Sequence, residues 1–185
     1  HIMEQYFCGA HSDLADGMCE SAIKSLIKNA RIALREPDNY AARGEFMVDC
    51  SLACNGILSI GNSYSGWPCH GMEHALSAYY DITHGEGLAI LTPRWMAHIL
   101  NDDTIERFVR FGVNIFGIDA ALPEAEIAQE TIRAVYARCE SVGMPRHLRE
   151  VGIDESRRSA MAHHIAENEG LDKAWAPLTE ADILA

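Results

Sequence analysis

Three histidines within a fifteen-residue stretch have the residue type and spacing that best fit chemistry. His70 and His74 are four residues apart, so on a helix their imidazoles share one face. His84 follows His70 by fourteen residues, which on one straight helix would separate them by about 21 Å. His70 and His84 can therefore share one metal ion only if the chain folds back between them. We expect that reversal at residues 81–83, with the two glycines of residues 85–87 giving backbone freedom just after it.

The same stretch allows two other interpretations. Residues 70–74, His-Gly-Met-Glu-His, fit the inverted zinc-peptidase motif HxxEH, in which Glu73 would be the general base on a zinc-bound water. That hypothesis gives no role to His84, so His84→Ala should leave the metal in place while Glu73→Gln abolishes activity. A non-catalytic helical scaffold, whose histidines are structural or which serves only assembly, predicts no stoichiometric metal and no effect of mutating His70.

The elements that must position these side chains are helices. Apolar residues recur at helical spacing through most of the sequence, and no strand-like alternation of useful length interrupts them. The pattern predicts an all-α lobe with helices over residues 1–7, 17–35, 40–60, 68–81, 84–100, 104–116 and 124–142, and two shorter helices after them. Side chains expected to cap helices are Asn39, either Asp102 or Asp103, Asp154, and Thr179 with Asp182 at its capping-box position.

Composition narrows the class of protein. The 185 residues suit one domain or one large lobe, and 48% of them are apolar, enough to bury a sizeable core. A formal net charge of −12 argues against nucleic acid and against an anionic membrane surface as partners. We find no segment apolar enough to span a membrane and no signal peptide, which predicts a cytoplasmic protein. The six cysteines are then expected to be reduced, with Cys50 and Cys54 buried as small hydrophobic side chains.

The stretch from Trp67 to Gly87 resembles, along its whole length, a signature of the iron-containing (group III) alcohol dehydrogenases. Its continuation, Leu-Ala-Ile-Leu-Thr-Pro-Arg-Trp-Met over residues 88–96, is similar to the butanol dehydrogenase branch. In that family an aspartate is followed four residues later by a histidine, and a glutamate comes three residues after that. His1 and Glu4 match the last two, and the aspartate would lie four positions before His1.

The resemblance implies a fold, a ligand set and a reaction. The fold would be the helical-bundle C-terminal domain of a dehydroquinate synthase-like or iron-dependent alcohol dehydrogenase, here over residues 1–185. The metal ligands would fall on His1, His70 and His84, holding Fe²⁺ or Zn²⁺, while His74 would lie beside the nicotinamide and the substrate as a catalytic and cofactor-binding residue. A second interpretation of His1 is a residue left from cloning that fits the motif by coincidence.

The nicotinamide cofactor raises a further expectation. The family binds NAD(H) or NADP(H) mainly through an N-terminal α/β domain, and we see no strand, glycine-rich turn and helix unit of that kind here. The resemblance therefore implies that the parent protein is an NAD(P)-dependent alcohol dehydrogenase, acting on small primary alcohols or aldehydes. This chain would be a fragment that holds most of the metal ligands and is inactive alone. Apolar surface exposed without the first domain favours a homo-oligomer.

Overall fold

The computed structural model describes residues 1–9, 12–61 and 66–185, and the regular elements in these ranges are all helices. Their bounds are α1 Ile2–Tyr6, α2 Asp13–Arg35, α3 Tyr40–Cys54, α4 Pro68–Tyr80, α5 His84–Ile99, α6 Ile105–Phe111, α7 Glu124–Ser141, α8 Arg158–Asn168 and α9 Glu180–Leu184. Short 3-10 or π turns lie at Ile57–Ser59, Gly112–Phe116, Leu148–Val151 and Leu171–Lys173. The prediction of an all-α fold is confirmed.

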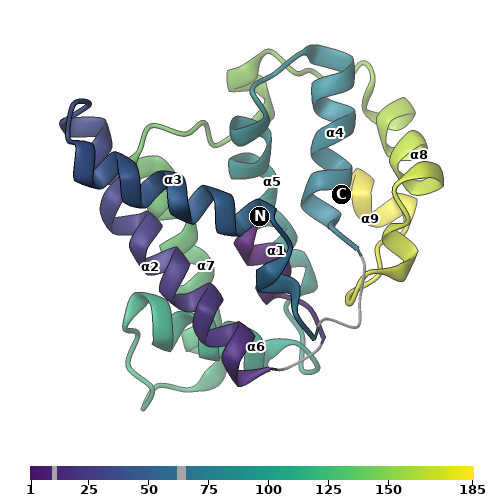
Figure 1. Ribbon diagram of the computed structural model, residues 1–185. Helices are drawn as coiled ribbons and strands as arrows, with labels where there is room; N and C mark the ends of the chain where they lie inside the picture. The colour runs from purple at the N-terminus through teal and green to yellow at the C-terminus, as the bar shows by residue number, and fades with distance from the viewer. Residues whose placement is uncertain (10–11, 62–65) are drawn as a thin grey trace.

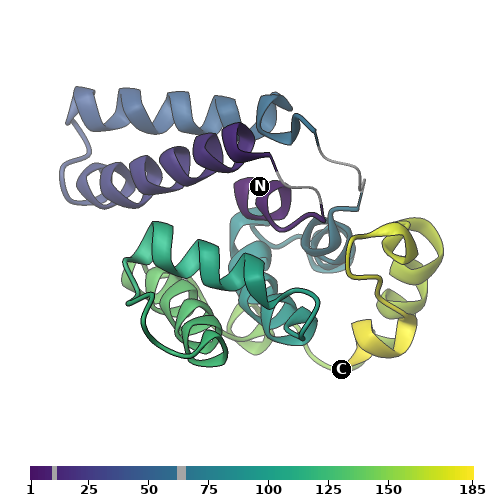
Figure 2. The same ribbon diagram turned by 90° about the horizontal axis from the view of Figure 1, so that it is seen from below.

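The helices pair along the chain, with α2 against α3, α4 against α5, α6 against α7, and α8 against α9. In Figure 1 the α2–α3 pair lies on one side, α4 and α5 are central, and α8 and α9 cover the far side of α4. Figure 2 shows the α6–α7 pair beneath the α2–α3 layer, with the N-terminus between them. The short helix α1 therefore enters the middle of the lobe. None of the helices in the described ranges is long and apolar enough to cross a membrane.

Aromatic side chains at the end of α1 anchor it in the core. Tyr6 and Phe7 are buried, and their rings lie 5.2 Å from the ring of Phe111, measured between centroids. Beside them Arg107 donates to both carboxylate oxygens of buried Asp16, at 2.7 and 2.9 Å, and also to the carbonyl oxygen of Tyr6. This charged pair is tolerated inside the lobe because the guanidinium donates to both carboxylate oxygens of Asp16 and to a backbone carbonyl.

Two of the predicted caps are confirmed. The Asn39 side chain accepts a hydrogen bond from the amide of Ala42 at 3.1 Å, and Thr179 and Asp182 form a complete capping box at the start of α9. Neither Asp102 nor Asp103 caps α6, which begins at Ile105 after Thr104. Asp154 accepts from the Ser156 amide at 2.9 Å, forming a turn two residues long, so α8 begins later, at Arg158.

Two predicted helices end earlier than their apolar patterns suggested. The helix expected over 40–60 stops at Cys54, and a 3-10 turn follows Gly56, whose φ is 81°. The helix expected over 104–116 changes to a π turn at Gly112, where an added Cβ would lie 2.0 Å from Thr131 Oγ1. Close packing of α7 at that glycine therefore accompanies the change in helix type.

The prediction that Cys50 and Cys54 are buried is wrong, because both are exposed on α3. Helix α3 packs against α2 alone among the long helices, so its outer face stays uncovered. That face also exposes Tyr40, Met47 and Val48. The sequence predicted both thiols in the core, whereas the described lobe covers only the side of α3 that faces α2.

Candidate metal centre

The chain reverses between α4 and α5, at the place the sequence predicts. Asp81 follows the last residue of α4 with φ 53°, the left-handed conformation that ends helices, and α5 starts at His84. Ser77 donates a hydrogen bond to the carbonyl oxygen of Ile82 at 3.3 Å, which ties the reversal to α4. As a result the rings of His70 and His84 lie 5.1 Å apart between centroids.

The glycines after the reversal have a different role from the one predicted. Gly85 and Gly87 lie inside α5, and neither has a positive φ. A Cβ on Gly87 would lie 2.5 Å from Glu73 Cγ, whereas one on Gly85 would meet nothing within 4 Å. Gly87 therefore allows close contact between α4 and α5, and it does not serve as a flexible joint.

Three histidines from separate helices converge. His1 precedes α1, His70 lies in the first turn of α4, and His84 opens α5. One ring nitrogen from each lies within 4.8 Å of the other two, and Nε2 of His1 is 3.1 Å from Nε2 of His70. Nitrogens bound to one tetrahedral metal at about 2.1 Å are separated by about 3.4 Å, so the cluster has the scale of a metal site. His70 is buried, His84 half-buried and His1 exposed, which leaves one side open.

Two buried carboxylates hold two of these rings from behind. Glu4 Oε2 contacts Nδ1 of His70, and Glu4 Oε1 accepts from the backbone amide of Cys69 at 2.6 Å. Glu73 Oε2 contacts Nδ1 of His84, while its other oxygen accepts from the hydroxyl of Ser77. With Nδ1 occupied, each ring presents Nε2 to the shared space. A carboxylate behind an imidazole fixes its tautomer and orientation and is the usual partner of a metal-bound histidine.

The zinc-peptidase hypothesis does not fit this arrangement. Glu73 has no exposed surface, and both of its oxygens are engaged by His84 and Ser77. A general base acting on a metal-bound water must face that water. Glu73 instead lies behind a ring of the cluster, and His74, the second histidine of the motif, is not among the three converging side chains.

His74 lies one turn along α4 from His70, at the open side of the cluster. Its side chain is exposed, its ring stacks on that of His84 at 6.0 Å and 20°, and Nδ1 is 3.9 Å from a carboxylate oxygen of Glu169. This position is close to the three histidines yet open to solvent, as a residue facing substrate would need.

Neighbouring groups limit which atoms could bind a metal. The Cys69 thiol is fully buried, and burial together with the nearby Glu4 carboxylate raises its pKa well above the usual value. It therefore stays protonated at neutral pH and is a poor ligand. Trp67 packs its ring edge-on at 4.8 Å from His70 and 5.9 Å from His1, which covers one flank of the cluster. The remaining donor set is all imidazole, which suits zinc or iron.

Sequence reasoning missed the functions of Glu4 and Glu73. From the sequence, Glu4 was named only as part of the family motif that begins before His1, and Glu73 only as the general base of the peptidase hypothesis. The available signal was a glutamate three residues after His1 and another eleven before His84. Their pairing with ring nitrogens depends on how three helices pack, which spacing alone does not specify.

Comparison with known proteins places this chain in a family. The Fe-containing alcohol dehydrogenase family, in its C-terminal region, matches residues 1–185. The chain is 47% identical over 171 residues to the NADH-dependent butanol dehydrogenase A of Clostridium acetobutylicum, covering 92% of this chain and 44% of that protein. It is 27% identical over 169 residues to the NADPH-dependent aldehyde reductase YqhD of Escherichia coli, covering 91% of this chain and 43% of that protein.

A solved structure supports the same family assignment. The NADH-dependent butanol dehydrogenase A of Thermotoga maritima superposes with a TM-score of 0.89 at 30% identity, covering all of this chain and 48% of that one. This chain therefore belongs to the Fe-containing alcohol dehydrogenases and corresponds to their helical C-terminal region, as the sequence resemblance predicted. It spans less than half the length of these relatives.

Proposed function

We propose that this chain is the metal-holding lobe of an NAD(P)-dependent alcohol dehydrogenase that acts on small primary alcohols and aldehydes. One observation carries the proposal most directly. His1, His70 and His84 converge, and the two buried carboxylates behind them leave Nε2 of His70 and His84 turned to one space. The relatives named above as butanol dehydrogenases and an aldehyde reductase support the substrate class and the nicotinamide.

The ligand set proposed here is His1, His70 and His84, with Fe²⁺ or Zn²⁺ as the ion. A bound ion of this kind supplies Lewis-acid chemistry toward an alcohol or carbonyl oxygen. Glu4 and Glu73 keep the His70 and His84 rings oriented, so that little reorganisation is needed on binding. Trp67 keeps water from one flank of the cluster.

His74 is the residue we assign to proton transfer and to contact with the nicotinamide. It lies on the open side of the cluster, and its ring stacks on His84. A neutral imidazole has one nitrogen that donates a proton and one that accepts, so it can pass a proton between the reacting oxygen and solvent. Exposure of its side chain keeps that route open to water.

We assign dinucleotide binding to a domain upstream of this region. The relatives are more than twice as long as the matched segment, which leaves room for such a domain in them. The fourth ligand would be an aspartate four positions before His1. On this proposal the 185-residue chain alone does not turn over alcohol, because one ligand and the cofactor site belong to the upstream part.

The test is metal content, measured by elemental analysis on protein purified without an affinity tag and without oxygen. Wild type is compared with His70→Ala and His84→Ala, and with His163→Ala, an exposed histidine of α8, as a matched control. The proposal expects near-stoichiometric iron or zinc in wild type and in the control, and loss in both cluster variants. Metal retained in His84→Ala but lost in His70→Ala would instead favour the peptidase motif.

A second experiment separates the site from the whole enzyme. The chain is extended upstream to include the aspartate and the first domain, as in the butanol dehydrogenases, and butanal reduction is followed through NADH absorbance. Restored activity that disappears in His74→Ala, with metal content unchanged, supports the assignment of His74 to proton transfer and of the other three histidines to metal binding. Absence of metal even in the extended protein would refute the metal-centre proposal.

A further inference from the structure

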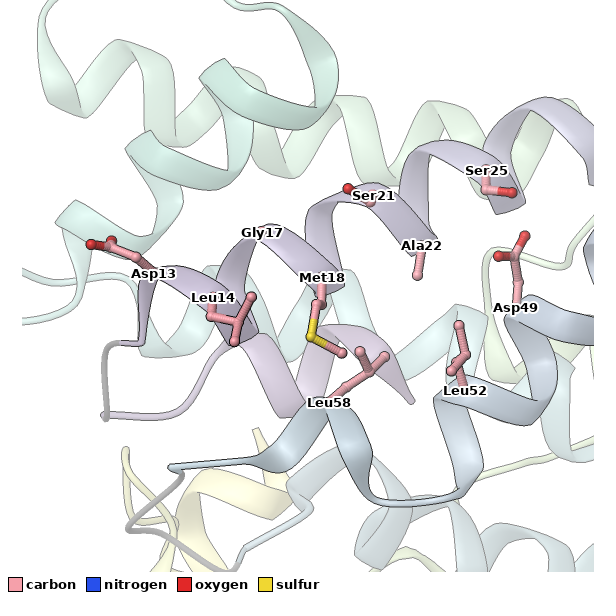
Figure 3. A pocket seen from close by; sticks show the side chains of 10 residues that line it. All are labelled: Asp13, Leu14, Gly17, Met18, Ser21, Ala22, Ser25, Asp49, Leu52 and Leu58. Carbon is pink, nitrogen blue, oxygen red and sulfur yellow. The ribbon is translucent and has the colours of Figure 1, made fainter.

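A groove of about 520 Å³ runs between α2 and α3, away from the histidine cluster. Its floor is mainly apolar, and Figure 3 shows Met18 of α2 meeting Leu58, from the turn after α3, in the middle of it. The lining side chains are Asp13, Leu14, Gly17, Met18, Ser21, Ala22, Ser25, Asp49, Leu52 and Leu58. Nothing in the proposed dehydrogenase chemistry uses this groove.

One end of the groove holds a buried carboxylate. Asp49 is 5% exposed, and its Oδ2 has no hydrogen-bond partner within the described residues. Figure 3 shows the Asp49 side chain rising from α3 toward Ser25 on α2. No cationic side chain in the described ranges forms an ion pair with it. An unpaired buried carboxylate is costly, so this end of the groove is complementary to a cation.

The rest of the groove limits what that cation is attached to. Met18, Leu52 and Leu58 offer a surface for methylene groups, and the Ser25 hydroxyl lies at the carboxylate end. A lysine side chain has this form, with an apolar stem and an ammonium that carries three hydrogen-bond donors. Its stem would lie along the floor and its ammonium would reach Asp49.

The surface around the groove indicates a polypeptide and not a free amine. Leu14, at one end of the groove, is 73% exposed, and it continues the apolar lining formed by Met18, Leu52 and Leu58. Apolar residues gathered around a groove mark a surface for a macromolecular partner.

We propose that the α2–α3 groove binds a lysine side chain presented by an apolar segment of a partner polypeptide, with Asp49 as its counter-ion. The inference is independent of the metal centre and of dehydrogenase activity. It assigns a binding role to the uncovered side of the α2–α3 pair.

The test is an NMR titration of the ¹⁵N-labelled chain with a blocked heptapeptide that has one central lysine flanked by alanine and leucine. A matched peptide carries norleucine in place of lysine, and n-pentylammonium chloride is the small-molecule probe. The titrations are repeated with Asp49→Asn, which keeps the shape of the side chain, and with Asp38→Asn, an exposed carboxylate in the turn before α3.

The lysine peptide should shift amide signals of α2 and α3 saturably. Its affinity should fall by about tenfold or more with norleucine or with Asp49→Asn, as expected for a charged hydrogen bond, and stay unchanged in Asp38→Asn. Equal affinity of the two peptides, or no binding of either, would overturn the proposal. So would pentylammonium binding as tightly as the peptide, or wild-type dimers in sedimentation velocity that Asp49→Asn dissolves.

Discussion

Replacing Glu73 by glutamine tests whether a buried carboxylate holds the metal centre in shape. Glu73 has no exposed surface and contacts Nδ1 of His84 and the hydroxyl of Ser77. Glutamine keeps the size and can still accept from one partner, but the bond to the ring is no longer charge-assisted. Hydrogen bonds to charged groups contribute about 1.5–3 kcal/mol, against about 0.5–1.5 kcal/mol for neutral ones. The difference between the middles of these ranges, about 1.25 kcal/mol, corresponds to a roughly eightfold loss of metal affinity.

The assay is Zn²⁺ competition with a chromophoric chelator at neutral pH, with circular dichroism to check the fold. Glu106→Gln, an exposed glutamate in the first turn of α6, is the control and should match wild type. Affinity of Glu73→Gln within twofold of wild type would refute the claim that Glu73 orients His84. A peptidase would behave differently, since its general base contributes to hydrolysis and is not needed to hold the ion.

Three further variants test packing and charge. Gly87→Ala should destabilise the lobe by about 1–3 kcal/mol, measured by urea unfolding, and should weaken Zn²⁺ binding, because its Cβ would displace Glu73. Gly85→Ala is the control and should be neutral or stabilising, because its Cβ would meet nothing within 4 Å. Asp16→Asn removes the negative charge that accepts two hydrogen bonds from the buried Arg107 guanidinium, and it should cost about 3 kcal/mol of unfolding free energy. A loss below about 1 kcal/mol would contradict the ion-pair account. Burial raises the pKa of Cys19 from 9.0 to about 12. As the pH rises, the thiol therefore loses its proton in the unfolded chain before it does so in the folded chain. The free energy of unfolding should then fall by about 1.4 kcal/mol per pH unit above about pH 9. Denaturation curves from pH 8 to 10.5 should show a shallower fall in Cys19→Ala, and equal slopes would count against this explanation.

The sequence predicts helix type well because each helix carries its own periodic signal. The apolar spacing of 17–35 and 124–142 is close to α2 and α7, and the Asn39 and Thr179 caps lie where predicted. These features depend on neighbours a few residues away. The α4–α5 reversal was also predictable, because two histidines fourteen residues apart can meet only around a bend.

Features that depend on distant packing were not predictable from the same signals. Helical spacing puts His74 on the His70 face, yet the nearer partner of His70 is His84, across the reversal. The position of the Glu73 side chain depends on how closely α5 packs against α4, and Gly87 is the residue that allows this close packing. Exposure of Cys50 and Cys54 depends on which helices cover α3, and an apolar pattern does not identify the covering element.

The contact between His1 and His70 joins residues 69 positions apart. An ion held by both rings would join two distant segments of the folded chain, and it would stabilise the fold because the unfolded chain has no such site. Helix α1 has five residues, too few to be stable alone in water. On the proposed ligand set, its order would depend on its aromatic anchors and on the bound ion together. Removing the ion should loosen the N-terminal helix first. Hydrogen exchange of the α1 backbone amides would therefore report whether the site is occupied.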